Sequence, residues 1–110
     1  MTIFITQGRY SRDAIKGLLA NPEDRSEVVA KLIAAAGGKM LAYYVTLGET
    51  DFLVISEMPS HKEASQVAVI AAAAGGVTDI RTTVAMTTAE AKEMFRGAGA
   101  IAAGYRPPGG

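Results

Sequence analysis

The chain has 110 residues, of which 49% are hydrophobic and 20% charged, a composition typical of a single soluble globular domain. Eleven basic residues balance eleven acidic ones, so no net field would draw the chain to nucleic acid or to an anionic membrane. The lack of cysteine excludes a disulfide framework, a thiolate nucleophile and a Cys-ligated metal centre. With neither a basic leader at the N-terminus nor an apolar run of roughly 18 residues, the sequence predicts a cytoplasmic protein.

The first part of the chain predicts a strand followed by a helix in two segments. Residues 2–10 are β-branched and aromatic at their start, which favours a strand. Ser11 suits the N-cap of a short helix. Asn21 and Pro22 suit the N-cap and first position of a second helical segment, and Gly37-Gly38 is a typical helix end.

The second part predicts a hairpin, a helix, a strand and a terminal helix. Residues 39–47 and 52–57 read as strands joined by the short turn 48–51, which is typical of an antiparallel hairpin. Ser60 begins a capping-box pattern for a helix that ends at Gly75-Gly76. Residues 77–86 form the fourth predicted strand, and Thr87 begins a second capping box for a short terminal helix.

The resulting order, β-α-β-β-α-β with an appended helix, is that of the ferredoxin-like α+β class. Right-handed crossovers would place both helices on one face of a four-stranded antiparallel sheet. We expect this domain to span residues 1–96, followed by a Gly/Ala/Pro-rich tail, residues 97–110.

The predicted strands carry large apolar residues on both faces, whereas a sheet covered on one side only should alternate apolar and polar residues. A bare apolar face is unusual for a soluble monomer. The sequence therefore predicts a homodimer, or a larger homo-oligomer, in which a second copy packs sheet against sheet. The alternative is that the terminal helix and tail cover this face.

Three stretches resemble one family. The hairpin "TLGETD" resembles the Leu-Gly-x-Tyr-Asp signature of the GYD-domain family, with Thr50 in place of the tyrosine. The opening "FITQGRYS" and the passage "AAAGGKMLAYYVTLG" are similar to that family's first strand and to its helix–Gly-Gly–strand junction. Together they cover roughly residues 2–96. The resemblance implies a ferredoxin-like subunit of the dimeric α/β-barrel kind and implies no particular reaction.

Two kinds of polar residue near the hairpin are candidates for ligand binding. Asp51 fits a turn in which its carboxylate bonds neighbouring amides, and as an alternative it could act as a general base or bind a substrate cation. Tyr43 and Tyr44 are adjacent and should point to opposite faces of their strand. Tyr10 and Tyr44 are the candidate phenols for a ligand, although tyrosine also suits an interface.

Two further candidates lie elsewhere in the chain. His61, the only histidine, fits a solvent-facing position at a helix start, and the alternative is a haem ligand or proton carrier. Arg81 fits an edge-strand charge. The alternatives are an ion pair with Asp79 on the same face or the binding of a carboxylate, which Arg9 on the neighbouring strand would favour. No cluster of residues has the spacing of a metal site.

Two main functions therefore remain open. The first is a small-molecule-binding or accessory homo-oligomer, consistent with the lack of a recognisable catalytic set. The second is a cofactor-independent or haem-dependent oxidoreductase, similar to a monooxygenase of the barrel type. A purely structural assembly subunit is a third hypothesis, and it predicts no cavity for a ligand. The sequence leaves any cofactor, and whether the protein is an enzyme, unassigned.

Overall fold

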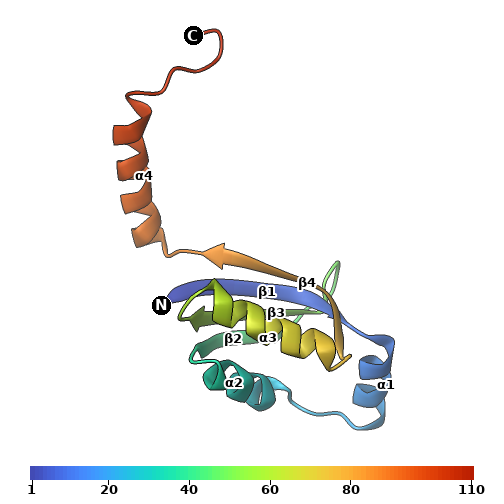
Figure 1. The fold of residues 1–110 in the computed structure, drawn as a ribbon. Coiled ribbons are helices and arrows are strands. Elements are labelled where there is room, and N and C mark those ends of the chain that lie inside the picture. Colours follow the sequence, from blue (N-terminus) through green and yellow to red (C-terminus); the bar gives the residue numbers. More distant parts are fainter.

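The computed structural model describes residues 1–110 as one antiparallel sheet with four helices (Figure 1). In chain order the elements are β1 (Thr2–Tyr10), α1 (Arg12–Ala20), α2 (Ser26–Ala35), β2 (Lys39–Val45), β3 (Phe52–Met58), α3 (His61–Ala73), β4 (Val77–Ala85) and α4 (Thr88–Ala102). The strands lie in the order β2-β3-β1-β4, and every neighbouring pair is antiparallel. The predicted ferredoxin-like fold is thus confirmed. None of the helices has the length and hydrophobicity that crossing a membrane requires.

The helix starts agree only in part with the sequence expectations. Ser11 caps α1 by accepting a hydrogen bond from the Ala14 amide. The prediction that Asn21 begins the next helix was wrong, because Asn21 is the C-cap of α1 and α2 begins only at Ser26. Asp24 accepts a hydrogen bond from the Ser26 amide at 2.9 Å, so a carboxylate two residues before the helix satisfies one of its free amides.

The later helices have the two capping patterns in different forms. At α4 the box is complete: Thr87 Oγ1 accepts from the Glu90 amide, and the Glu90 carboxylate accepts from the Thr87 amide. At α3, Ser60 accepts from the Lys62 amide, but its hydroxyl donates to the Glu63 carboxylate. These hydrogen bonds lower the pKa of the Glu63 and Glu90 carboxyl groups.

Irregular pairing in β2 and β4 decides which side chains face the helices. The register shifts between Met40 and Ala42 in β2, where Met40 lies opposite Ser56 and Tyr43 opposite Val54. A second shift in β4 lies opposite the Gln7–Arg9 stretch of β1. Such bulges insert an extra residue and interrupt the alternation of faces.

The core lies between the sheet and helices α2 and α3. It consists of Phe4, Ile33, Phe52, Val54, Met58 and Ala64. The buried members of β3 occupy every second position, as expected for a strand with one face against the helices. Both helices lie on this same side of the sheet, which Figure 1 shows.

The opposite side, which we call the far face, carries no helix. Alternation along β1 and β3 places Ile3, Ile5, Leu53 and Ile55 on it, paired across the strands as Ile5 with Ile55. Tyr44 pairs with Leu53 on the same face. The terminal helix does not cover it: α4 stands away from the sheet (Figure 1) and buries none of its own residues. The middle of the far face, around Ile5 and Ile55, is therefore apolar and without a covering helix in a single chain, whereas Gln7 and Glu57 are polar residues on the same face.

A candidate ligand pocket beneath the helices

A pocket of about 460 Å³ lies between the sheet and helices α2 and α3. Of its 21 lining residues, 17 are hydrophobic. They come from both layers: Val54 from β3, Leu32 from α2 and Val67 from α3 are examples. This volume lies within the range of small-molecule sites, so the fold leaves room for a ligand beside its core.

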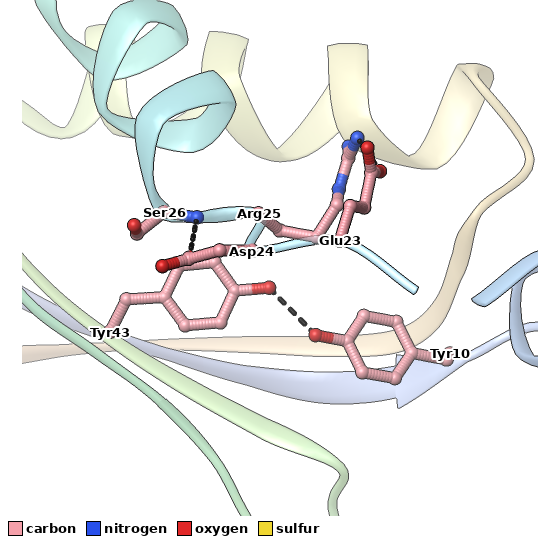
Figure 2. Close-up of polar contacts among 6 residues, drawn as sticks. All are labelled: Tyr10, Glu23, Asp24, Arg25, Ser26 and Tyr43. Carbon is pink, nitrogen blue, oxygen red and sulfur yellow. Dashed lines mark hydrogen bonds and ion pairs between the residues drawn. The ribbon is translucent and has the colours of Figure 1, made fainter. Parts of the chain in front are cut away.

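Two phenols form the polar end of the pocket. The hydroxyl groups of Tyr10 on β1 and Tyr43 on β2 lie 2.7 Å apart and share a hydrogen bond (Figure 2). Both rings pack near Phe52, with centroids 5.3 Å and 6.5 Å from it. Burial, and then the hydrogen bond with Tyr10, raise the pKa of Tyr43. The Tyr43 hydroxyl therefore keeps its proton at neutral pH. Because a pair of phenols carries two donor protons and uses only one in its internal hydrogen bond, the other can be donated to a ligand oxygen.

Arg25 is the cation of this region. It lines the apolar pocket and two neighbouring hollows, and Tyr10 lines all three with it. Its guanidinium pairs with the Glu23 carboxylate at 2.9 Å, and both side chains are partly exposed. Figure 2 shows the 23–26 segment passing over the phenol pair. The positive charge of Arg25 beside the phenols is thus already compensated by Glu23.

Asp51 helps to fix the position of Tyr10 by a hydrogen bond to its backbone amide. Its carboxylate accepts a hydrogen bond from the Tyr10 amide at 2.9 Å, and its own amide donates to the Gly8 carbonyl at 2.8 Å. The sequence predicted bonds to amides within the turn, whereas the bonded amide belongs to β1. Asp51 therefore fastens the β2–β3 connection to the strand that carries Tyr10.

The other candidates do not join this cluster. Tyr44 lies on the far face and is 62% exposed. His61 is exposed at the first position of α3. Arg81 is exposed on the edge strand β4, with no ion pair to Asp79. Arg9 donates instead to the Glu49 carbonyl at 2.9 Å. No group of three or more His, Cys, Asp or Glu side chains is arranged to hold a metal ion.

The β2 bulge decides which of the adjacent residues Tyr43 and Tyr44 faces the helices. Uninterrupted alternation from Met40, which packs against the core, would turn Tyr44 toward the helices. The register shift after Met40 turns Tyr43 there instead. Arg25 was missed entirely, since nothing in its local sequence distinguishes it from other charged loop residues.

The fold and this site together define a small ferredoxin-like α+β domain with an apolar pocket that ends in two phenols. The model of the GYD domain matches residues 4–95, and the chain belongs to that family. The resemblance inferred from the hairpin is thereby confirmed. Thr50, which replaces the signature tyrosine, contributes its carbonyl to a 2.8 Å hydrogen bond from the Thr46 hydroxyl. A search of curated proteins found no match to the chain.

Several solved structures are similar to the chain. TTHA0845 from Thermus thermophilus has 16% identity and a TM-score of 0.51, over 79% of this chain and 95% of that one. FFRP-DM1 has 20% identity and a TM-score of 0.48, over 78% and 100% of the two chains. The hypothetical protein PHS023 from Pyrococcus horikoshii has 20% identity and a TM-score of 0.47, over 79% and 92%. The likeness to TTHA0845 concerns the fold alone.

Proposed function

We propose that this GYD-domain protein is a small-molecule-binding homo-oligomer of the cytoplasm, with its ligand in the pocket between the sheet and helices α2 and α3. The observation that carries the proposal is an apolar pocket of about 460 Å³ whose lining includes the hydrogen-bonded Tyr10–Tyr43 pair. The ligand that fits this chemistry has a flat or flexible apolar body and one oxygen acceptor, such as a carboxylate or carbonyl. This oxygen would accept a hydrogen bond from the phenol O–H that the Tyr10–Tyr43 pair does not use internally.

The ionisable groups of the pocket favour binding over the alternative oxidoreductase. Proton transfer needs a group whose pKa lies near the working pH, whereas burial raises that of Tyr43. Arg25 is paired with Glu23, and His61 is not among the residues that line the pocket. The same pocket argues against a purely structural subunit, because such a protein needs no space for a ligand.

The homo-oligomeric part of the proposal rests on the far face. Ile5 and Ile55 lie side by side across β1 and β3, and no helix of the same chain covers them. A second copy placed sheet against sheet would remove this surface from water, and burial of apolar area is worth about 25 cal/mol per Å². A dimer of this kind leaves the pocket on the outer side of each sheet.

Two measurements test the binding function. Native mass spectrometry of freshly purified protein should show a retained small molecule. Protein stripped of it by unfolding and refolding should bind 2-naphthoate, an aromatic acid chosen as a probe, with saturation in calorimetry. The substitution Tyr43→Phe should weaken that binding about fivefold to tenfold, since it removes one hydrogen bond worth about 1 kcal/mol.

A matched pair of substitutions locates the binding. Val67 lines the pocket, whereas Val69 on the same helix is 66% exposed. Val67→Trp should fill the pocket and abolish 2-naphthoate binding, and Val69→Trp should leave it unchanged. The binding function would be refuted by protein that retains no molecule and binds no 2-naphthoate, or by unimpaired binding to Val67→Trp protein of normal circular dichroism.

A further inference from the structure

Helix α4 is amphipathic but packs against nothing in its own chain. Its apolar residues, Ala91, Met94, Phe95, Ala98 and Ile101, recur at the spacing that aligns them along one side of a helix. Phe95 is 67% exposed and Ile101 78% exposed. The charged residues Lys92, Glu93 and Arg96 occupy the opposite side, where Arg96 pairs with Glu93. A stripe of this kind is expected on a helix that lies against a partner.

The dimensions of the molecule agree with a missing partner. Its radius of gyration is 17.9 Å, whereas a compact chain of 110 residues has about 13 Å. Its accessible surface is 7758 Å², whereas a compact monomer of 11.4 kDa has about 5,800 Å². The excess of about 2,000 Å² per chain is in the range that stable homodimers bury.

We propose that α4 is an arm that packs, through its Met94–Phe95 stripe, on a second copy of this chain seated on the far face. The proposal rests on the sheet pairing proposed above and adds the arm to it. It is independent of the pocket and its ligand.

The position of α4 makes a second copy the fitting occupant. Ala85, the last residue of β4, pairs with Ile3, which lies on the far face, and α4 begins three residues later at Thr88. A copy seated on the far face would therefore lie beside the base of α4. The helix has 15 residues and so is about 22 Å long, enough to cross a four-stranded sheet about 14 Å wide. The far face and the start of α4 are thus neighbours in the fold.

Paired substitutions on the two sides of α4 test the arm in the full-length chain. Met94→Ser/Phe95→Ser removes the stripe, and Lys92→Ser/Glu93→Ser introduces the same residues on the charged side without changing net charge. Size-exclusion chromatography with light scattering over a concentration series gives the dimer Kd. We expect the first pair to raise it at least about 100-fold, because each large apolar side chain contributes about 1.5 kcal/mol or more. The second pair should change it less than about threefold.

Isotope-mixed cross-linking tests which copy receives the arm. Chains labelled with ¹⁴N and ¹⁵N are unfolded together, refolded and treated with a lysine-reactive cross-linker, and the links from Lys92 to Lys39 or Lys62 are read by mass spectrometry. Links between a light and a heavy chain are expected in a statistical proportion. Links confined to chains of one isotope, or a dimer unaffected by loss of the stripe, would refute the arm while leaving the sheet pairing intact. A monomeric wild-type protein would refute both, and neither result bears on binding of 2-naphthoate.

Discussion

The Asp51 carboxylate joins two segments that are distant in sequence. It accepts a hydrogen bond from the Tyr10 amide at 2.9 Å, and this hydrogen bond is partly buried. Replacement by alanine would leave that amide without its charged partner, so Asp51→Ala should lower the free energy of unfolding by about 1.5–3 kcal/mol. Asp51→Asn keeps an oxygen acceptor and should cost less. Urea unfolding of the three proteins gives the values.

A functional role for Asp51 would give a different pattern. If the carboxylate instead binds a cationic ligand, Asp51→Asn should abolish retention of the small molecule seen by native mass spectrometry while stability stays at the wild-type level. The hydrogen bonds of Asp51 to β1 lead us to expect the reverse, with reduced stability and little change in affinity.

Tyr43 should make the free energy of unfolding depend on pH in the alkaline range. Burial raises its folded-state pKa above the unfolded value of about 10, so folding favours the neutral phenol. The resulting stability is fully present below about pH 10 and is lost as the pH rises toward the folded-state pKa. The free energy of unfolding should therefore fall as the pH rises above about 10, and Tyr43→Phe should reduce that fall. Urea titrations at several pH values check this, with Tyr44→Phe as the exposed control; equal losses in all three proteins would contradict it.

The pocket residues show how far single residues can be predicted from a sequence. Tyr10 and Asp51 were each candidates from residue type and position alone, and the structure joins them through the Tyr10 amide and the Asp51 carboxylate. The orientation of Tyr43 toward the helices depends on one extra residue in β2. The residue types around a bulge of this kind do not reveal it. The position of Arg25 beside the pocket depends on how the loop before α2 lies over the sheet. Tertiary packing sets that position, and the local sequence does not reveal it.

At the scale of elements, two Gly-Gly helix ends look alike in sequence but differ in their surroundings. Gly37 and Gly75 both have positive φ, at 88° and 82°, as helix ends of this type require. A Cβ on Gly38 would lie 2.5 Å from the Glu57 carbonyl and would also overlap the Met58 sulfur, whereas a Cβ on Gly76 meets nothing within 4 Å. Gly38 therefore serves packing of the helix end against β3 in addition to the turn itself.

Alanine substitutions separate these two roles. Gly38→Ala should lower the free energy of unfolding by about 1–3 kcal/mol through overpacking. Gly76→Ala should be neutral, or stabilising by a few tenths of a kcal/mol, because it restricts the unfolded chain without a clash. Thermal or urea unfolding compares them directly. Equal effects would mean that the close approach of Gly38 to β3 does not limit packing.

The elements themselves were predictable where local chemistry is decisive. The bounds of β1 agree with the sequence, and the Gly-Gly ends and the Thr87 cap were found where expected. The start of α2 was predicted too early, because asparagine followed by proline is also typical of a helix start. In the structure Asn21 ends α1 instead. The terminal helix extends to Ala102, past the Gly97 at which the tail was expected to begin, since isolated glycines among alanines do not stop a helix.

At the scale of the whole molecule, the apolar residues on both faces of the strands indicate that the sheet has a partner. Ile55 lies on inner strand β3, paired with Ile5 and Ala42, near the middle of the far face. Ile55→Lys would place a charge in the proposed interface, and two-fold symmetry would place two such charges close together. An uncompensated buried charge costs about 3 kcal/mol or more, so the dimer Kd should rise at least about 100-fold.

The control for Ile55→Lys is the same kind of change on the opposite side of the molecule. Val69→Lys introduces a lysine on the outer side of α3, where the side chain is already 66% exposed, and should leave the dimer intact. Light scattering gives the mass of each variant, and circular dichroism verifies that each is folded. Dissociation by Val69→Lys together with a stable Ile55→Lys dimer would place the interface on the helices. The far face and the α4 arm would then need another explanation, because the surface that links them would stay exposed to water in the assembled protein.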